Sequence, residues 1–581
     1  MWRLLGYLKP YKWKVAGAIL ALFFTSLVEL ALPYLTKIGI DKYIANDDFN
    51  GLLLVIWLYL FVLVMEFGLK FTQTYAVNWI GQKAMYDLRS EVFSHIQKLT
   101  IPFFDKNPVG RLVTRVTTDI GSLHEMLSSG VVAIFGDLFK LGGIIIILVS
   151  ANWKLALVTF SVMPVLFFVT FFFRKRVRDI YRLIRVRIAS INTFLQESVS
   201  GISVIQLFNR EEKSSERFAG LNADHRDAHL KTILYYGAFF PTVRLLSSAA
   251  IAMILWYGGG QILKSTLTFG ALVAFIQYAE MFFRPIMDLS EKYNLMQSAM
   301  ASSERIFALL EELPEPKTAV YDSQFASSFK GEIEFENVYF SYHNNDYVLK
   351  DISFKVKSGE KIAFVGATGA GKTTILSLLL RFYEAQKGRI LIDGTNIKEI
   401  DPQQLRKQFG MVQQDIFIFD GSIARNIKLT DQIDDAEVVR AAREVYADGF
   451  IQKFKGKYNQ PVLERGKGLS VGQRQLLSFA RALAHNPSIL VLDEATSSVD
   501  TDTEQLIQNA LEKLMRSRTS LIVAHRLSTI QSADRIIVMH KGMISETGTH
   551  SELLEQNGIY KQLYKLQYAE QETRALSKTQ L

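Results

Sequence analysis

The chain has 581 residues, 49% hydrophobic and 21% charged, so it is too long for one hydrophobic core and its average composition conceals two unlike halves. Its 66 Lys and Arg against 57 Asp and Glu give a net charge of +9, an excess too small to predict nucleic-acid binding. The absence of cysteine excludes disulfide scaffolds, thiol catalysis and cysteine-ligated metal sites.

Six apolar stretches, each long enough to cross about 30 Å of hydrocarbon as a helix, occupy the first half of the chain. They lie near Lys14–Leu35, Gly51–Tyr75, Ser128–Ser150, Lys154–Phe173, Ala238–Ile262 and Thr268–Leu289. Buried helices of a soluble protein rarely run this long without a polar face. The sequence therefore predicts a six-helix, all-α transmembrane domain over residues 1–312.

The connections between these stretches predict how the chain lies in the membrane. The segment Arg174–Lys231 is rich in Lys and Arg, whereas the links after the first, third and fifth stretches carry only Lys37, Lys42, Lys154 and Lys264. Basic residues accumulate in cytoplasmic connections. We therefore expect a multi-pass protein of the cell membrane, with its N-terminus and the second half of the chain in the cytoplasm.

Two cytoplasmic connections, near Ala76–Leu127 and Arg174–Gly237, are far longer than the roughly two to eight residues that usually join neighbouring helices. Helical periodicity within them, as in Met85, Leu88 and Val92, predicts helical arms that extend roughly 35–40 Å beyond the bilayer. We expect these arms to reach a cytoplasmic domain.

The composition changes after the last apolar stretch. Residues 313–330 contain two prolines and many polar residues, as expected of a linker. Over residues 331–569, short apolar runs such as KIAFVG, SILVLD and LIVAH alternate with helical segments. This alternation predicts an α/β domain with a largely parallel sheet, followed by a polar tail over residues 570–581.

The segment Gly366–Thr373, GATGAGKT, matches the phosphate-loop pattern G-x-x-x-x-G-K-[ST] and lies between an apolar run and a helical run. Its glycines let backbone N–H groups surround phosphate oxygens, and the N-terminus of the following helix adds positive potential. Lys372 is placed to reach the β- and γ-phosphates, and Thr373 to bind Mg²⁺. The pattern predicts a site for a nucleoside triphosphate with Mg²⁺.

Two further segments carry groups suited to phosphate chemistry. Ser470, in LSVGQ, begins a helix and could donate to a phosphate together with backbone amides, although alone the segment predicts only a capped helix. The run Ile489–Glu494, ILVLDE, ends in two carboxylates. Asp493 is placed to hold Mg²⁺ and Glu494 to polarise a water that attacks the γ-phosphate. A solvated acidic turn is the alternative, which the phosphate loop disfavours.

Together these motifs resemble the ABC transporter family, specifically an exporter-type half-transporter of the multidrug or lipid exporter kind. LSVGQ stands where that family has its signature sequence. The resemblance runs from Met1 to about Ala569. It implies a multidomain fold, in which an ABC-type transmembrane domain precedes an α/β P-loop ATPase domain, and it implies ATP and Mg²⁺ as cofactors.

Other family positions are matched one at a time. Tyr342, in FENVYFSY, stands where the family stacks an aromatic ring on adenine, with a tyrosine packed on the sheet as the alternative. Gln414, in MVQQD, matches the glutamine that senses Mg²⁺ and water, with Gln413 as a competing choice. His525, in IVAHR, matches the switch histidine that contacts the γ-phosphate.

The resemblance implies four groups of site residues. ATP binding falls to Tyr342, Gly366, Thr368, Gly369, Ala370, Gly371, Lys372, Thr373 and Thr374. The signature that faces the ATP of an opposing subunit consists of Ser470, Val471, Gly472 and Gln473. Catalysis falls to Glu494, His525 and Gln414, and the Mg²⁺ ligands are Thr373, Gln414 and Asp493. Glu464–Gly466 resembles the exporter loop before the signature, and Ser497–Asp500 the loop that crosses to the opposing subunit.

The family sandwiches ATP between the phosphate loop of one subunit and the signature of another, so a single copy of each implies a dimer with a second half-transporter. Val471 departs from the usual LSGGQ, in which glycine allows close approach of the backbone to the γ-phosphate. In heterodimeric exporters, the chain that keeps its catalytic glutamate often carries an altered signature. Glu494 with Val471 therefore favours a heterodimer over a homodimer that tolerates valine.

Several charged residues lie within or near the ends of the apolar stretches: Glu29, Glu66, Lys70, Asp137, Lys140, Arg244, Glu280, Arg284 and Asp288. Ionisable groups at membrane depth are costly, so they line a cavity or pair internally. Glu280, Arg284 and Asp288 repeat every fourth residue, which favours pairing over substrate contact. The many phenylalanines suit a lipid-like substrate and suit contact with membrane lipid equally well.

The leading hypothesis for function is ATP-driven export of hydrophobic or amphipathic small molecules such as drugs, or of lipids. A soluble ABC-type ATPase acting in DNA repair or translation would share the nucleotide motifs but not the membrane spans, so no nucleic-acid partner is expected. The alternative is a membrane-bound, ATP-gated regulator or channel without net export.

Overall fold

The computed structural model describes residues 2–316, 329–343, 346–493, 501–524 and 527–567. The chain divides into two compact units. The first, here called the helical unit, comprises Met1–Lys98 and Asn107–Glu312, and the second, the sheet unit, comprises Leu99–Lys106 and Leu313–Leu581. The predicted fold class is confirmed, because an N-terminal all-helical region precedes an α/β region.

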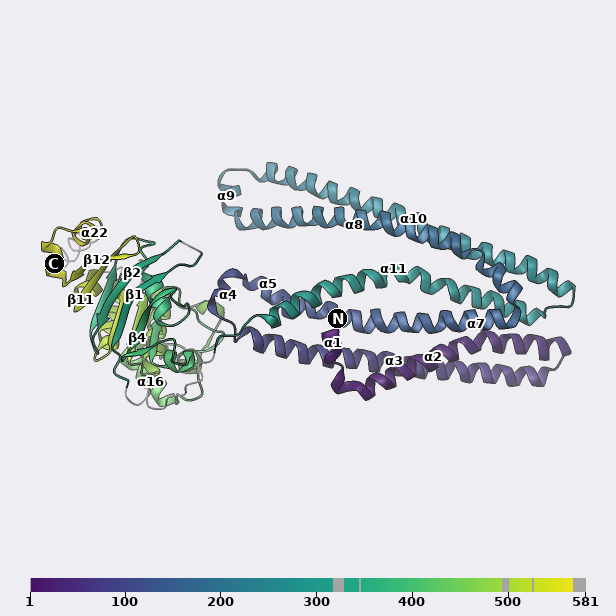
Figure 1. Cartoon of the computed structure of the whole chain (residues 1–581), viewed down its shortest axis with the longest axis horizontal. Coiled ribbons are helices and arrows are strands. Elements are labelled where there is room, and N and C mark those ends of the chain that lie inside the picture. Colours follow the sequence, from purple (N-terminus) through teal and green to yellow (C-terminus); the bar gives the residue numbers. More distant parts are fainter. Residues whose placement is uncertain (1, 317–328, 344–345, 494–500, 525–526, 568–581) are drawn as a thin grey trace. The chain divides into compact units, whose positions relative to one another are not determined.

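Long α-helices build the helical unit (Figure 1). They are α2 (Lys12–Ile38), α3 (Phe49–Ile96), α7 (Val132–Phe160), α8 (Met163–Ser200), α10 (Glu211–Leu263) and α11 (Phe269–Glu311). Shorter helices are α1 (Trp2–Gly6), α5 (Val109–Thr114), α6 (Ile120–Glu125) and α9 (Ile202–Leu207). Single turns of π-helix at Gly39–Tyr43, Arg115–Asp119 and Met126–Val131 join some of them.

Within the described residues, four helical stretches are long and apolar enough to cross a membrane: Lys9–Asn46, Phe49–Ile96, Val109–Phe160 and Glu211–Leu263. A shorter apolar helix covers Phe269–Phe283. The fourth predicted span, Lys154–Phe173, is divided between two helices, because α7 ends at Phe160 and α8 begins at Met163. Pro164 lies in the first turn of α8, where its missing N–H does not interrupt the hydrogen bonds of a helix.

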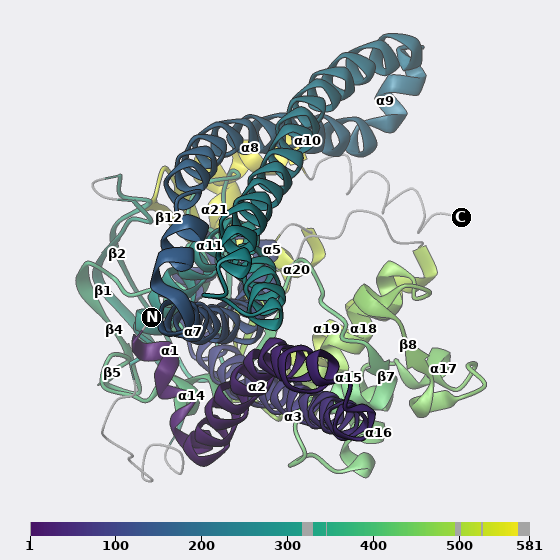
Figure 2. The ribbon, with the colours of Figure 1, turned by 90° about the vertical axis from the view of Figure 1, so that its right-hand side faces the viewer.

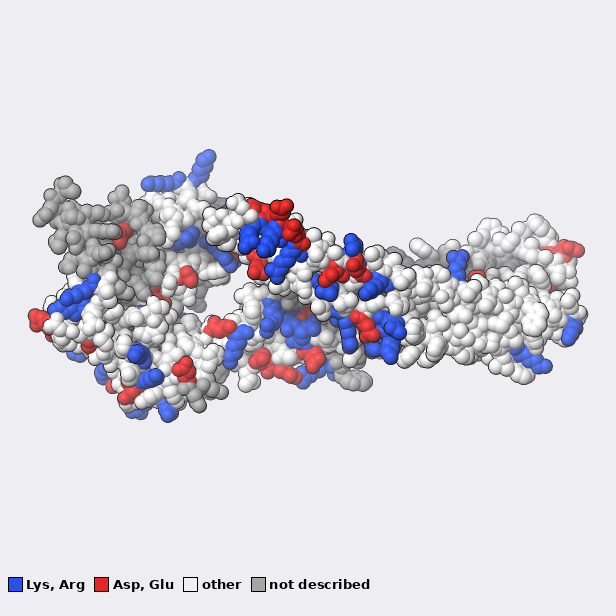
Figure 3. Space-filling model, turned by 90° about the horizontal axis from the view of Figure 1, so that it is seen from above, with Lys and Arg blue, Asp and Glu red and all other residues white. Residues whose placement is uncertain are grey.

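Helices α8 and α10 run side by side and are joined by α9, and Figures 1 and 2 both show this pair diverging from α2 and α3. The helices of this unit expose many large apolar side chains, among them Phe168 and Phe172 on α8. Figure 3 shows that charged side chains gather over one part of the helical unit and are sparse over another long part. That distribution fits a surface in contact with hydrocarbon over part of its length.

Ion pairs connect helices within this unit. Glu29 on α2 pairs with Lys140 on α7, and the Nζ of Lys70 on α3 lies 3.7 Å from the same carboxylate. Asp137 on α7 pairs with Lys292 on α11. Glu29, Lys70, Lys140 and Asp137 thus pair within the unit, which is one of the two arrangements that the sequence left open. The sequence predicts that Glu280, Arg284 and Asp288 pair on one face of α11. The structure does not describe the side chains of Arg284 and Asp288, so that pairing stays a prediction.

The sheet unit contains a six-stranded sheet of order β12-β11-β3-β10-β9-β6. Its strands are β3 (Lys361–Val365), β6 (Phe409–Val412), β9 (Ile489–Asp493), β10 (Thr519–Val523), β11 (Arg535–His540) and β12 (Met543–Gly548). All pairings are parallel except that of β11 with β12, as the alternating pattern predicts. Every residue of β9 and β10 is buried, as expected of strands covered on both faces.

A second, antiparallel sheet has the order β2-β1-β4-β5, and β7 pairs with β8. These strands are β1 (Ile333–Phe340), β2 (Leu349–Val356), β4 (Lys387–Ile392), β5 (Thr395–Asn396), β7 (Gly421–Ser422) and β8 (Pro461–Val462). The helices of this unit are α4 (Ile101–Lys106), α13 (Lys372–Leu379), α14 (Pro402–Lys407), α15 (Ile423–Lys428), α16 (Asp435–Glu444), α17 (Asp448–Ile451), α18 (Val471–Ala484), α19 (Thr501–Met515), α20 (Leu527–Gln531), α21 (His550–Glu555) and α22 (Ile559–Gln567).

Candidate nucleotide site

The carboxyl ends of four parallel strands meet at one edge of the large sheet. In the strand register, Val523 on β10 pairs with both Phe364 on β3 and Asp493 on β9. Val412, the last residue of β6, pairs with Leu492, so Gln413 and Gln414 follow at the same edge. Ligands of open α/β sheets bind at this edge. The sheet therefore gathers the segments that the sequence assigned to nucleotide chemistry.

The turn between β3 and α13 holds the predicted phosphate loop. Gly371 has a φ of 98°, in the left-handed region that favours glycine, and a Cβ there would lie 2.6 Å from Leu349 Cδ2. A Cβ on Gly366 would lie 2.4 Å from the carbonyl oxygen of Met539. Only glycine fits at these two positions. Thr368 and Gly369 are exposed and Ala370 is buried, so the middle of the loop is open to a ligand.

Lys372, the first residue of α13, closes the loop. Its Nζ donates to the carbonyl oxygen of Gly366 at 2.8 Å and to that of Ala367 at 3.1 Å. Burial lowers the pKa of this ammonium group, against the attraction of the nearby Asp493 carboxylate. The lysine thus carries a desolvated positive charge, which a phosphate would stabilise.

The predicted Mg²⁺ ligands lie at the same edge but differ in exposure. Thr373 is exposed on the first turn of α13, whereas Asp493 is buried at the end of β9. Gln413 and Gln414 are both exposed just after β6, so their exposure does not show which of them is the Mg²⁺ ligand. A hydroxyl and a carboxylate are the oxygen ligands that Mg²⁺ takes beside phosphates. The residues present fit ATP with Mg²⁺.

Tyr342 lies just after β1 with an exposed ring. Its hydroxyl lies 3.1 Å from Thr374 Oγ1 on α13, which links it to the phosphate-loop helix. The ring packs edge-on against Phe340 at 4.9 Å and against Tyr383 at 5.0 Å between ring centroids. It also lines a pocket of about 600 Å³ within the sheet unit. An exposed, oriented ring of this kind can stack on a base.

Sequence reasoning missed Tyr383 and its partner. The Tyr383 hydroxyl donates to the carboxylate of Asp105 on α4, and burial together with this bond raises the pKa of the phenol. Leu99, at the start of the same short segment, pairs with Pro314 in an isolated β-bridge. Nothing in the local pattern around Asp105 predicts a contact 278 residues away.

The predicted signature forms the start of α18. Ser470 is its N-cap and accepts from the N–H of Gln473, while the Gln473 side chain accepts from the N–H of Ser470. This capping box fixes the first turn of the helix. Gly472 is buried, whereas Val471 is 37% exposed, so the residue that departs from the family pattern is on the accessible side of the turn.

Several predicted residues lie outside those that the structure describes. They are the catalytic candidates Glu494 and His525 and the crossing loop Ser497–Asp500. The described strands β9 and β10 end at Asp493 and Val523, shortly before these segments. Glu464–Gly466 forms one 3-10 turn in which Arg465 has a φ of 59°.

Comparison with known proteins identifies both units. The family model for the ABC transporter transmembrane region matches residues 15–286, and the ABC transporter model matches residues 349–497. An uncharacterised ABC transporter ATP-binding protein of Bacillus subtilis is 40% identical over 98% of this chain and 94% of its own length.

Relatives with named substrates are nearly as similar. An ATP-dependent lipid A-core flippase of Syntrophus aciditrophicus is 34% identical over 98% of this chain and 94% of its own length. A fatty acid ABC transporter ATP-binding/permease protein of Mycobacterium bovis is 38% identical over 84% of this chain and 78% of its own length. The chain therefore belongs to the ABC transporter family, as a membrane-spanning exporter half-transporter whose sheet unit is an ATP-binding ATPase domain.

Proposed function

We propose that this chain exports hydrophobic or amphipathic small molecules such as drugs, or lipids, across the cell membrane at the expense of ATP. The observation that carries the proposal is the strand register, which brings the phosphate loop and Asp493 to one edge of a sheet in a chain that also supplies membrane helices. The names of the lipid A-core flippase and the fatty acid transporter support a lipid-like substrate.

We assign the following roles to the residues of the predicted nucleotide site. The loop amides from Gly366 to Thr373 and the Lys372 ammonium group bind the phosphates, and Tyr342 stacks on adenine. Thr373, Asp493 and Gln414 hold Mg²⁺, which when bound neutralises charge that develops on the phosphates. Glu494 orients and polarises the attacking water, and His525 contacts the γ-phosphate.

The proposal places the ATPase domain and the N-terminus in the cytoplasm, on the basis of the Lys and Arg in Arg174–Lys231. The substrate consequently moves away from the side that binds ATP. Inside-out membrane vesicles test this direction. ATP should drive accumulation of a fluorescent amphiphile in them, above its level with a non-hydrolysable ATP analogue. ATP hydrolysis without accumulation of any amphiphile would support the alternative of an ATP-gated regulator or channel.

We further propose that the working complex is a heterodimer. Val471 is exposed at the first turn of α18, where a β-branched side chain keeps a phosphate farther from the backbone than glycine would. In the heterodimer, this chain supplies Lys372 and Glu494 to the competent site and its altered signature to the weaker one. The native mass of the complex from its own membrane tests this: twice 66.0 kDa with one chain would overturn it, and a different second chain would support it.

A further inference from the structure

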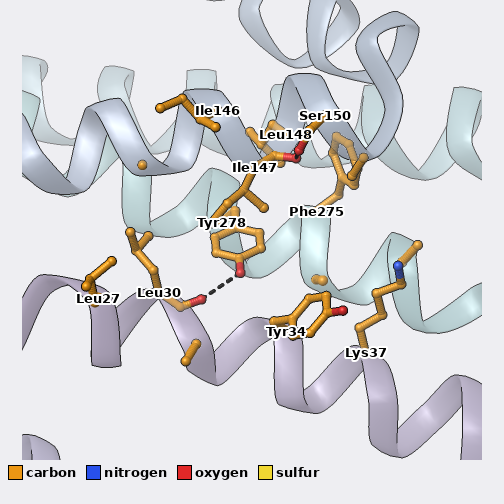
Figure 4. Close-up of a pocket in the computed structure, with 15 residues that line it drawn as sticks. Leu27, Leu30, Tyr34, Lys37, Ile146, Ile147, Leu148, Ser150, Phe275 and Tyr278 are labelled. Atoms are coloured by element: carbon orange, nitrogen blue, oxygen red, sulfur yellow. Dashed lines mark hydrogen bonds between the residues drawn. The ribbon is translucent and has the colours of Figure 1, made fainter.

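An open pocket of about 620 Å³ is lined by α2, α7 and α11 of the helical unit (Figure 4), and the side chains of Ile146 and Tyr34 on its wall are more than half exposed. Its lining is mostly apolar and includes Leu27 on α2, Ile146 and Ile147 on α7, and Phe275 on α11. The Tyr278 hydroxyl donates to the carbonyl oxygen of Leu30 at 2.6 Å, so this polar group within the wall is already satisfied. A pocket of this size and character suits an aliphatic chain.

One end of the pocket is charged. Lys37, in the last turn of α2, is half-buried and lines the pocket together with Tyr34, whose ring centroid lies 5.9 Å from Nζ. Figure 4 shows both side chains at the end opposite Leu27. None of the ion pairs among the described residues includes Lys37. A half-buried ammonium group without a carboxylate partner favours an anion.

The nearest acidic residue along the helix is committed elsewhere. Asp41, one turn beyond Lys37, accepts from the Thr268 hydroxyl at 2.6 Å and from the N–H of Gly270 at 2.7 Å, at the start of α11. A Cβ on Gly270 would lie 2.6 Å from the carbonyl oxygen of Lys37, so the two helices are in close contact there. These bonds hold the Asp41 carboxylate toward the start of α11, and it forms no ion pair with Lys37 among the described residues, so the ammonium group remains available to the pocket.

We propose that this pocket binds an amphiphile with an anionic head group and a single aliphatic chain. The head group lies against Lys37 and Tyr34, and the chain lies along Leu27, Ile146 and Ile147. Its role as a transport site rests on the proposed export function, whereas binding does not. With the N-terminus in the cytoplasm, Lys37 lies toward the outer face, so the site would receive the anion on the side to which it is exported.

Photo-crosslinking tests the site in the full-length complex, reconstituted in phosphatidylcholine vesicles that lack anionic lipid. The probe is a palmitic acid carrying a diazirine near its methyl end, used at alkaline pH so that its carboxyl group, whose pKa the bilayer raises, is ionised. Label should appear in peptides from α2 and α7 that line the pocket. Oleate should compete about fivefold to tenfold better than oleyl alcohol, the ratio that a partly buried charge pair supplies.

Variants at the charged end separate binding from general damage. Lys37→Gln should lower labelling about fivefold to tenfold and remove the preference for oleate, and Lys37→Arg should keep both. Lys42→Gln is the matched control, because Lys42 is exposed in the next turn and does not line the pocket. Ala31→Phe, which places a ring in the pocket from α2, should abolish labelling there.

Three results would overturn the site: labelling of Lys37→Gln equal to wild type, equal competition by oleyl alcohol, or no label in the pocket peptides, as expected if a partner chain fills it. ATP-driven uptake into vesicles is measured in parallel. Normal labelling without uptake would count against export and leave the site standing. Uptake without labelling would support export and count against the site.

Discussion

The two units differ in where they place their large apolar side chains. In the sheet unit, Phe364 and Val523 are fully enclosed in a core between strands and helices. On α3 of the helical unit, Trp57, Phe61 and Phe67 are mostly exposed. The sheet unit thus gains its stability from burial within itself. The helical unit has buried apolar clusters too, such as the one around Ile144 and Leu148, but it also presents many large apolar groups outward, so it depends on lipid or on further helices.

The largest test of this contrast removes one ring from each unit. Phe364→Ala should cost about 3–5 kcal/mol of unfolding free energy, because the ring is fully buried. Phe67→Ala, whose ring is 74% exposed, should cost less than about 0.5 kcal/mol. Thermal unfolding of the purified protein in detergent measures both. Similar losses for the two variants would remove the distinction between the units.

The next effect concerns chemistry at the edge of the large sheet. Lys372→Met should lower ATP hydrolysis at least about a hundredfold, because preorganised charge at a phosphate supplies an effect of that size. ATP turnover by the purified complex is the measurement. Lys453→Met is the matched control, since Lys453 is an exposed lysine of the same unit, and it should hydrolyse ATP normally. A small effect of Lys372→Met would argue against the phosphate loop.

The polar contacts of the helical unit can be tested at Asp119. This buried carboxylate accepts from Ser302 Oγ at 2.9 Å and from Arg305 Nε at 3.1 Å, both on α11, and pairs with Arg115 at 2.8 Å. Asp119→Asn should lower the unfolding free energy by about 2 kcal/mol, because it leaves two guanidinium groups without their anion. The matched control is Asp227→Asn, at an exposed carboxylate, which should change the unfolding free energy by less than about 0.5 kcal/mol. Equal melting temperatures would show that this cluster does not stabilise the unit.

The smallest expected effect is at the signature. Val471→Gly should raise ATP hydrolysis by the complex a few-fold, since about 1 kcal/mol of improved contact with a phosphate corresponds to about fivefold in rate. Turnover is measured with the native partner present. A decrease would indicate that the valine supports the start of α18 and does not weaken the site.

Local patterns predicted the sheet unit well. The phosphate loop, the capped helix at Ser470 and the parallel strands each follow from a few neighbouring residues with specific backbone requirements. Contacts between distant segments were not predictable, because no local signal links Asp105 to Tyr383 or Asp119 to Arg305. In the helical unit, hydropathy located apolar stretches but not their breaks. The non-helical backbone at Asn152 separates the third and fourth predicted spans, and the break within the fourth falls just before Pro164, at the start of α8.

The most direct test of the proposed mechanism is ATP hydrolysis by Glu494→Gln, because that mechanism assigns the attacking water to Glu494, the residue that follows Asp493 in the sequence. The variant is compared with wild type in the native complex, with ATP binding measured alongside. Nearly complete loss of turnover with normal ATP binding is the predicted result. Substantial remaining hydrolysis would contradict the assignment.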